Sequence, residues 1–452
     1  MLKLKNLLMA EKILELILFM SNMENRKQSR TSEDRDGVDM ISKLPDPILH
    51  LILSRLQSTE EVIRTSILSS RWRHLWTSVP SIDIDYSRRL NPNEEFEKNK
   101  FEHFVSHVLS TNTLDLDTFR LHCTNYYNMS TIKQWIHVAI TRKVKLIDLM
   151  FCPKDQLDYI EVPDCNSLRV LRLFLLGHAI RVPKLQGFSV LRVLELNSVQ
   201  IFDGDLVTDL LKRCPLLKDL KLKNLVFSSH IQISCPKLAF LELTGYIGHF
   251  KYILKNLDKL KKAVINPNVS VSVSAYELMG HNNLRELFVG ISRVKFLSIN
   301  PLIILKSIDA VSLPNLKTLE LRTSIDNFPM DDVIKIVKHY PHLEALHLII
   351  QDVVSYQRSN SFQFAYEKLD EVETMRILTR HLKRIEFLEF SGQNPSLNLA
   401  RLLLLYGDAL EEMVFSWGDK EKYPRKSTET MKKMSKFCKA SSIVKVATLL
   451  RE

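Results

Sequence analysis

Two pairs of acidic residues are the first candidates for chemistry in this sequence. Asp83 and Asp85 are separated by one residue, and so are Asp115 and Asp117. Paired carboxylates can act as general acid and base when a proton donor or a cation lies nearby. The sequence indicates no such group beside either pair, so we expect these four residues to be exposed acids.

Histidines, cysteines and glycines offer no clearer site. His339, His342 and His347 form a group, but they lack the HExxH spacing of a zinc site. The six cysteines include no CxxC pair, and the chain contains no GxxxxGK[ST], GxGxxG or GxSxG motif. The sequence therefore predicts no catalytic residue, no metal site and no cofactor, and it indicates a protein that is not an enzyme.

Composition and charge narrow the class of protein. The chain has 452 residues, of which 45% are hydrophobic and 25% charged, as is ordinary for a globular protein of two or three domains. The net charge is +11, and residues 417–452 carry ten Lys or Arg against four Asp or Glu. Such a basic tail could bind nucleic acid or an anionic membrane, although a solvated face is the simpler interpretation. Scattered cysteines favour a reducing compartment, the nucleus or the cytoplasm.

A repeat with the pattern LxxLxL dominates the chain. Copies with leucine at all three positions begin at Leu168, Leu191, Leu217, Leu238, Leu316 and Leu343. Weaker copies, with other residues at some positions, begin at Leu116, Val144, Leu260, Leu284, Ile385 and Leu410. Successive copies mostly start 21 to 28 residues apart, and the longer intervals from 284 to 316 and from 343 to 385 suggest insertions or a missed unit near Phe296 and Leu297. This spacing predicts a solenoid of short repeats.

Each copy ends in two apolar residues that are two positions apart, which predicts a short strand with one apolar face. Stacked strands would form a parallel ladder with a leucine core, and helices are expected over residues 205–213 and 331–339, each ending before a proline. The residue between the two apolar positions should lie on the opposite, concave face. These residues are Arg120, Asp148, Arg172, Glu195, Lys221, Glu242, Val264, Phe288, Glu320, His347 and Glu389.

That face carries five acids against three fixed cations, so it favours a protein target over nucleic acid. The assignment depends on the register, because a slip of one residue exchanges the two faces. The candidate target-binding residues are Arg172, Glu195, Lys221, Glu242, Phe288 and Glu320.

The stretch from residue 40 to residue 80 predicts three short helices with more apolar surface than so small a unit can bury. Asp46 can cap a first helix that starts at Pro47, and Ser58 and Glu61 have the spacing of a capping box. Uncovered Leu, Ile and Trp side chains mark a partner interface, whereas packing against the rest of the chain would make the same residues core. The pattern leaves both possibilities open.

The same stretch resembles an F-box of the plant type. The resemblance runs without a gap through LPDPIL at 44–49, IL at 52–53, VIRTSILS at 62–69 and RWRHLW at 71–76. In that family the F-box docks on the Skp-type adaptor of a cullin–RING ubiquitin ligase. The resemblance implies that ten residues form or support the docking face: Leu44, Pro45, Ile48, Leu49, Ile52, Leu53, Leu56, Val62, Trp72 and Trp76.

The repeats resemble the leucine-rich repeats of plant F-box proteins, and residues 371–416 resemble the FBD module that closes many of them. The FBD resemblance rests on Gly392, the apolar run 402–405 and the segment LEEM at 410–413, and it lacks the acidic residue that is common before the helix. We therefore expect an α+β multi-domain fold, with a helical F-box and an irregular α/β solenoid. Its parts would be a flexible leader (1–39, with Met23 as a possible start), the F-box (40–80), a linker and first helix (81–104), leucine-rich repeats (105–370), an FBD-like cap (371–416) and a basic tail (417–452).

These resemblances imply the non-catalytic substrate-recognition subunit of a Skp–cullin–F-box ubiquitin ligase. Its partners would be the Skp-type adaptor, through it a cullin–RING ligase, and an unknown target protein, with no nucleic acid and no membrane. One alternative is a leucine-rich-repeat scaffold outside ubiquitination, in which residues 45–76 only cap the solenoid. Another is a nucleic-acid or membrane binder that uses the basic tail.

Overall fold

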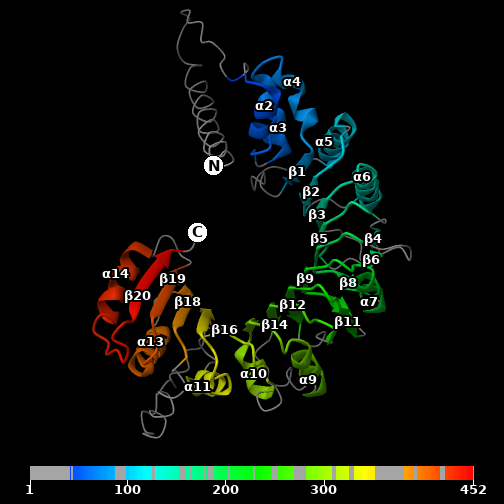
Figure 1. Cartoon of the computed structure of the whole chain (residues 1–452). Coiled ribbons are helices and arrows are strands. Elements are labelled where there is room, and N and C mark those ends of the chain that lie inside the picture. Colours follow the sequence, from blue (N-terminus) through cyan, green and yellow to red (C-terminus); the bar gives the residue numbers. More distant parts are fainter. Residues whose placement is uncertain are drawn as a thin grey trace, which may run out of the picture. The chain divides into compact units, whose positions relative to one another are not determined.

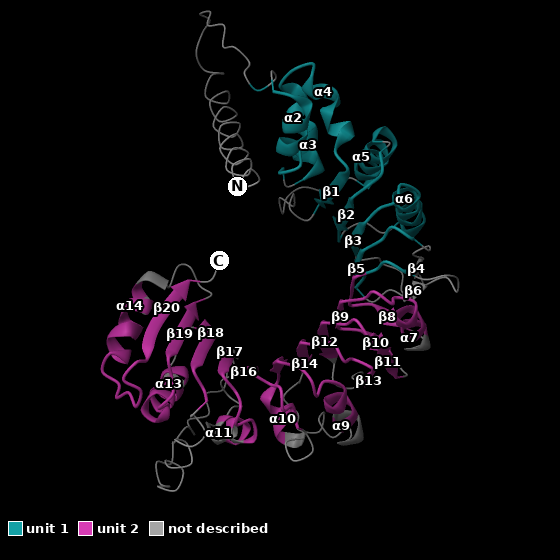
Figure 2. Cartoon of the chain, viewed as in Figure 1, with its two compact units in different colours: residues 1–191 teal, residues 192–452 magenta. Residues whose placement is uncertain are grey.

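Short strands that bury every second side chain form the main sheets of the computed structural model (Figure 1). The chain divides into two compact units, residues 1–191 and residues 192–452 (Figure 2). No helix in the described part of the chain is long and apolar enough to cross a membrane. The structure describes residues 41, 44–56, 58–86, 98–112, 114–124, 128–151, 159–161, 165–176, 179–181, 188–201, 204–227, 230–246, 252–268, 281–307, 312–324, 330–351, 381–390, 394–417 and 423–450.

Unit 1 begins with a cluster of short helices. They are α2 (Asp46–Leu53), α3 (Thr59–Arg64), η1 (Thr65–Ile67), α4 (Trp72–Leu75) and η2 (Trp76–Ser78). The Ser58 side chain accepts a hydrogen bond from the Glu61 backbone N–H at 3.3 Å, so one half of the expected capping box is present. The first helix starts one residue earlier than expected. Pro45 holds its N-cap position and Asp46 lies in its first turn, where a carboxylate favours the positive end of the helix dipole.

The sheet of unit 1 starts within the segment that we expected to be a linker. Residues Ser81–Asp85 form β1, because Ile82 and Ile84 alternate with polar residues and bury completely. The sheet continues in parallel through β2 (Thr118–Cys123), β3 (Leu146–Phe151) and β5 (Val170–Phe174). Helices α5 (Lys98–Thr111) and α6 (Met129–Thr141) connect its strands, and β4 (Tyr159–Glu161) pairs with β6 (Ala179–Arg181).

Unit 2 contains a longer parallel sheet, with helices on one of its faces (Figure 1). In order, its strands are β7 (Val193–Asn197), β9 (Asp219–Lys223), β12 (Phe240–Tyr246), β14 (Lys262–Asn268), β15 (Phe296–Ile299), β16 (Thr318–Ser324), β17 (Ala345–Gln351), β18 (Arg384–Phe390), β19 (Glu412–Trp417) and β20 (Lys445–Leu450). Its helices are α7 (Gly204–Lys212), α9 (His281–Gly290), α10 (Pro301–Ser307), α11 (Met330–His339), α13 (Asn394–Tyr406) and α14 (Tyr423–Met434). Unit 2 also contains two short parallel pairs outside this sheet. They are β8 (Gln200–Ile201) with β10 (Val226–Phe227), and β11 (Ile231–Ser234) with β13 (Tyr252–Lys255).

The leucines of the repeat form the core, as the pattern predicts. Leu217, Leu220 and Leu222 are each at most 1% exposed, and the aligned leucines of neighbouring strands are buried in the same way. Burying one such side chain contributes about 2 kcal/mol. Residues at equivalent positions after β7 and β9 turn the chain: Ser198 and Asn224 have φ of 53° and 50°. Their N–H groups each donate to a carbonyl of the next repeat at 2.9 Å, so the turns stack as the strands do.

Two weak copies of the repeat were assigned in the wrong frame. Residues 284–289 lie in helix α9, and the strand of that unit is β15, which contains Phe296 and Leu297, where a missed unit is expected. In β18 the set in register with the leucines of β17 is Leu382, Ile385 and Phe387, three residues before the set that begins at Ile385, although Leu388 and Phe390 are buried as well. Glu389, expected in the concave row, instead has φ of 53° at a β-bulge.

The C-terminal segment also differs from the expectation of a tail. Residues Tyr423–Met434 form α14, and Lys445–Leu450 form β20, which pairs in parallel with β19. The segment that resembles an FBD module forms α13 and the strands β18 and β19 of the same sheet. Because β20 follows β19 in that sheet, the module is not its last part. Residues 371–380 and 391–393 of this segment, which include Gly392, lie outside the described residues.

Candidate protein-interaction surfaces

Burial divides the ten residues of the expected docking face into two groups. Leu49, Ile52, Leu53, Val62, Trp72 and Trp76 are buried, between 0% and 9% exposed. Leu44 and Leu56 are half-buried, and Pro45 and Ile48 are exposed. Six of the ten therefore form the internal core of the helical cluster. They can support a docking face, but they do not present apolar surface to a partner.

Other apolar residues of the same helices are exposed. Leu51 is 36% exposed, Ile67 86% and Leu68 43%, beside 39% for Ile48. Ile48 and Leu51 are three residues apart on α2, which places them on one side of the helix. Helical spacing could have identified this pair, but Ile67 and Leu68 belong to a short 3-10 turn and its end, where spacing says little. We call these four residues the F-box apolar face.

The other side of the helical cluster covers the first strand. The Asp83 backbone N–H donates to Thr59 Oγ1 of α3 at 2.8 Å, and Asn112 Nδ2 of the following segment donates to the Val79 carbonyl at 2.7 Å. Thr59 and Asn112 are both buried. The helices therefore cap the edge of β1 with one side and expose apolar residues elsewhere, so capping and partner binding need not exclude each other.

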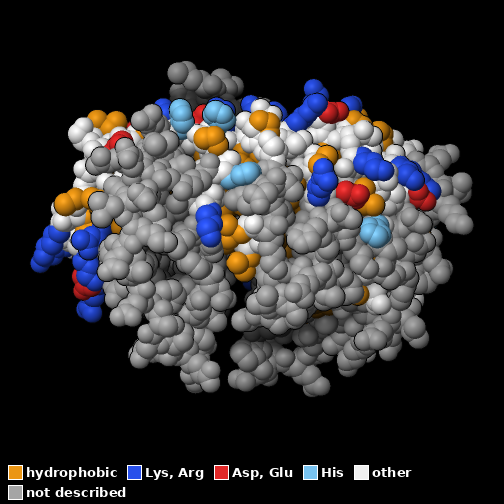
Figure 3. All heavy atoms as spheres, turned by 90° about the horizontal axis from the view of Figure 1, so that it is seen from below, with side chains coloured by type: hydrophobic (Ala, Val, Ile, Leu, Met, Phe, Trp, Pro, Cys, Tyr) orange, Lys and Arg blue, Asp and Glu red, His pale blue; other side chains and the backbone are white. Residues whose placement is uncertain are grey.

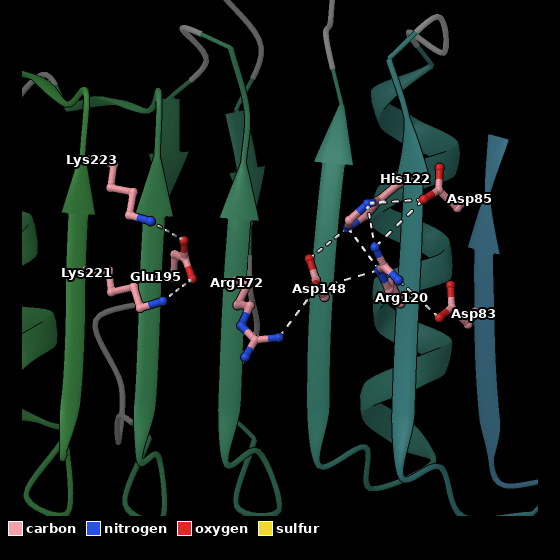
Figure 4. Close-up of polar contacts among 9 residues, drawn as sticks. All are labelled: Asp83, Asp85, Arg120, His122, Asp148, Arg172, Glu195, Lys221 and Lys223. Atoms are coloured by element: carbon pink, nitrogen blue, oxygen red, sulfur yellow. Dashed lines mark hydrogen bonds and ion pairs between the residues drawn. The ribbon is translucent and has the colours of Figure 1, made fainter. Parts of the chain in front are cut away.

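Charged side chains of unit 1 meet on the face of the sheet that faces away from the helices (Figure 4). Arg120 on β2 lies 3.3 Å from Asp83 and 3.7 Å from Asp85 on β1, and 3.8 Å from Asp148 on β3. His122 Nε2 lies 2.8 Å from Asp148 Oδ1. The expectation that Asp83 and Asp85 are exposed acids without a nearby cation is therefore wrong. Parallel pairing in register brings Arg120 beside them.

Asp148 is the centre of this group. Burial alone would raise the pKa of its carboxyl, but the hydrogen bond from His122 and the positive charges around it hold the pKa below the ordinary value. One of these charges is Arg172 on β5, whose Nη1 lies 3.7 Å from Asp148 Oδ2. Arg172, a candidate target-binding residue, is thus engaged within unit 1. The arrangement holds charges of opposite sign together across three neighbouring strands.

The second acidic pair also has cations beside it. Lys143 Nζ lies 3.3 Å from Asp115, and Lys145 pairs with Asp117, both at the exposed surface. The three histidines do not converge. His339 packs edge-on against Tyr340, His342 lies beside His381, and His347 Nε2 is 4.0 Å from a Glu386 oxygen. Within the residues that the structure describes, no group of His, Cys, Asp or Glu is arranged to hold a metal ion.

In unit 2, the predicted register is correct for the first strands. Glu195, Lys221 and Glu242 are aligned across β7, β9 and β12. Glu195 lies 3.5 Å from Lys221 Nζ and 3.1 Å from Lys223 Nζ (Figure 4). Lys223 also lies 3.3 Å from Glu242, and although burial alone would lower the pKa of Lys223, these two carboxylates raise it. The candidate cations and acids of these strands are largely paired with one another.

Beyond β12, the row of residues on the open face includes uncharged side chains. Val264 and Ser298 follow Glu242 in register, and then Glu320 and His347. Ser298 is fully buried and donates a hydrogen bond to Glu320 Oε1 at 2.7 Å. The predicted member Phe288 is wrong: it lies in α9 and is only 2% exposed, because its LxxLxV frame also fits a helix. Ser298 holds the position that we assigned to Phe288.

Charge over the surface is mixed as well. On the face that Figure 3 shows, the described Lys and Arg side chains are interspersed with acidic and hydrophobic ones. A continuous basic track of the kind that binds a nucleic-acid backbone is not seen among the described residues of that face.

Comparisons with known proteins agree with the two main features. Residues 41–83 match the F-box domain, and residues 132–348 match the leucine-rich repeats of the FBD-associated F-box protein At5g56370. F-box/LRR-repeat protein 13 of Arabidopsis thaliana is 28% identical over 314 residues, which cover 60% of this chain and 67% of that protein. The FBD-associated F-box protein At5g22730 of the same plant is 25% identical over 435 residues, covering 84% and 88%.

Among solved structures, the leucine-rich-repeat protein LegL7 of Legionella pneumophila aligns with 82% of this chain and 91% of its own, at 11% identity and a TM-score of 0.36. The helical cluster, the leucine-lined parallel sheets and the matches at 41–83 and 132–348 lead to one assignment. The chain has an F-box domain and an FBD-associated leucine-rich-repeat region, and its relatives include Arabidopsis F-box/FBD/LRR-repeat proteins.

Proposed function

We propose that this chain is the substrate-recognition subunit of a Skp–cullin–F-box ubiquitin ligase. In this function the F-box docks on a Skp-type adaptor, and the open strand face of the repeats holds a target protein. The chain contributes no chemistry of its own. It raises the effective concentration of the target near the ubiquitin-charged enzyme, which is sufficient to accelerate transfer. We assign this activity to the nucleus or the cytoplasm.

The observation that carries the proposal is the F-box apolar face within the residues that match an F-box domain. Ile48, Leu51, Ile67 and Leu68 are 36% to 86% exposed although they are large and apolar. Several exposed large apolar residues on the short helices of one small unit commonly mark a protein interface. The buried residues Trp72 and Leu49 would hold the helices that present them.

Co-purification of the full chain with a Skp-type adaptor tests the proposal. The variant Ile48→Ser/Ile67→Ser removes apolar surface from the F-box face, and it should weaken adaptor binding by about tenfold or more while the circular dichroism stays unchanged. The matched control is Val289→Ser/Ile443→Ser, which removes similar side chains that are 65% and 64% exposed in unit 2. The control should bind the adaptor as the wild type does.

Failure has two distinct forms. A folded wild-type chain that does not bind the adaptor would contradict the ligase assignment and favour a scaffold whose helices only cap the sheet. Equal loss of binding in both variants would show that the F-box apolar face is not the docking site.

A further inference from the structure

Four lysines lie at one edge of the sheet in unit 2, on three of the four consecutive strands β9, β12, β14 and β15. Lys218 and Lys295 precede β9 and β15, and Lys261 precedes β14, whose first residue is Lys262. Backbone hydrogen bonds link this edge from strand to strand: Ala239 N–H donates to Lys218 O, Lys261 N–H to Ala239 O and Lys295 N–H to Lys261 O, at 2.8 to 2.9 Å. Because neighbouring strands lie about 4.8 Å apart, the four lysines span roughly 14 Å. We call them the lysine edge.

The charges of the lysine edge are not neutralised by the part of the chain that the structure describes. All four side chains are exposed, and no carboxylate of the described residues lies within 4.0 Å of them. Lys221 and Lys223, in the neighbouring rows of the open face, are both paired with Glu195. Four ammonium groups in so short a span repel one another, so binding of an anion would stabilise them.

Two aromatic rings lie among these lysines. Phe240 and Phe296 occupy the first positions of β12 and β15, and both are half-buried. Lys262 Nζ lies 4.1 Å from the centroid of the Phe296 ring and 5.8 Å from that of Phe240. The rings therefore hold an ammonium group between two apolar surfaces, which gives the edge an affinity for apolar side chains as well as for carboxylates.

We propose that the lysine edge, with Phe240 and Phe296, binds an acidic peptide segment that also carries large apolar side chains. An extended peptide advances about 3.3 Å per residue, so roughly five residues would cross the edge. Nucleic acid fits less well, because its phosphates continue beyond the short edge and would lie over Glu242 and Glu320 in the next row of the open face, whereas a peptide can confine its carboxylates to the lysines. The inference rests on the proposed function only in that it regards the peptide as part of a ligase target.

Fluorescence anisotropy with the full chain tests this inference. The probe is a labelled peptide, Glu-Phe-Glu-Glu-Phe-Glu, compared with the same peptide in which glutamine replaces glutamate and with a short single-stranded oligonucleotide. The edge variant reverses four charges: Lys218→Glu, Lys261→Glu, Lys262→Glu and Lys295→Glu. The control reverses four exposed lysines in and after α14, so that net charge changes equally: Lys432→Glu, Lys433→Glu, Lys436→Glu and Lys439→Glu.

We expect the acidic peptide to bind the wild type and the control alike, and to bind the edge variant at least about tenfold more weakly. The glutamine peptide should bind weakly to all three. Absence of peptide binding by the wild type, or equal loss in both variants, would overturn the proposal. Tighter binding of the oligonucleotide, lost in the edge variant, would overturn it in favour of nucleic acid.

Adaptor co-purification from the same preparations separates this inference from the proposed function. The edge variant should retain the adaptor, because its substitutions lie in unit 2 and the F-box lies in unit 1. A chain that binds the adaptor but not the peptide would refute the inference alone.

Discussion

The open face of unit 1 and the lysine edge of unit 2 contain similar numbers of charged residues, which are used in opposite ways. On the first, Arg120 contacts Asp83, Asp85 and Asp148 within 4 Å, and each charge has a partner of opposite sign. On the second, Lys261 and its neighbours have no acidic partner among the described residues. Paired charges on adjacent strands help to hold those strands in register, whereas unpaired charges remain free to bind a partner.

This difference also shows why net charge is a poor guide to the binding surface. The excess of basic residues at 417–452 pointed to the C-terminal segment as an alternative site for a polyanion. That segment is folded into α14 and β20, and it adds a strand to the sheet. Lys221 and Lys262, whose ammonium groups lie near phenylalanine rings, belong instead to β9 and β14 of the repeats that precede it.

The largest effect should follow the removal of Asp148 from unit 1. Asp148→Ala leaves His122 without its hydrogen-bond partner and Arg120 without one of its three carboxylates in a half-buried site, and we expect it to lower the free energy of unfolding by about 2 kcal/mol. Urea unfolding measured by circular dichroism tests this. Asp148→Asn, which keeps a hydrogen-bond acceptor, should cost less. A loss below about 0.5 kcal/mol for the alanine variant would show that the network of unit 1 is as dispensable as a surface ion pair.

Acid should weaken the same network to a smaller extent, because a protonated Asp148 can still form a hydrogen bond. The pKa of Asp148 is lower in the folded chain than its ordinary value. Its ionised form therefore stabilises the fold above the unfolded-state pKa, and this contribution is lost as the pH falls through the folded-state pKa. Between about pH 5 and pH 3 the wild type should lose more stability than Asp148→Asn. Parallel losses in the two proteins would contradict this.

The smallest effect distinguishes paired from unpaired lysines within unit 2. Lys223→Gln removes a cation that lies 3.1 Å from Glu195 and 3.3 Å from Glu242, and it should cost about 1 kcal/mol of unfolding free energy. Lys295→Gln, on the lysine edge, should change it by less than about 0.5 kcal/mol. Equal costs for both substitutions, measured by urea unfolding, would remove the distinction between the two surfaces.

Most of the fold follows from the spacing of leucines, and the errors arise where one spacing fits two structures. Residues i and i+3 share a face of a helix as well as the start of an LxxLxL strand, so Leu284 and Leu287 fit a strand frame although they lie in α9. Val289, the third member of that frame, is 65% exposed. In β18 the bulge between Phe387 and Phe390 allows the apolar residues of both possible LxxLxL frames to be buried. The spacing of apolar residues therefore cannot show which frame the strand adopts.

The candidate surfaces were less predictable because they depend on packing between elements. The F-box resemblance located the helices, but whether Ile48 or Leu49 faces outward depends on how α2 packs on its neighbours. The lysine edge also corresponds to a pattern of basic residues in the sequence. A Lys or Arg follows the first apolar residue of the repeat at Arg192, Lys218, Lys261, Lys295, Lys317 and Lys383. Only structure shows which of these have partners, as Lys317 has in Glu344.

The parallel ladder of unit 2 has a further consequence for how this chain can vary. Each internal strand of that ladder bonds to the strand before and the strand after it, as β14 does to β12 and β15. Gain or loss of one repeat would therefore lengthen or shorten the unit by one strand spacing, about 4.8 Å, and leave the remaining contacts in place. The length of the strand face therefore changes only in steps of one repeat. The length of a ligand that lies across several strands would have to match a whole number of these steps.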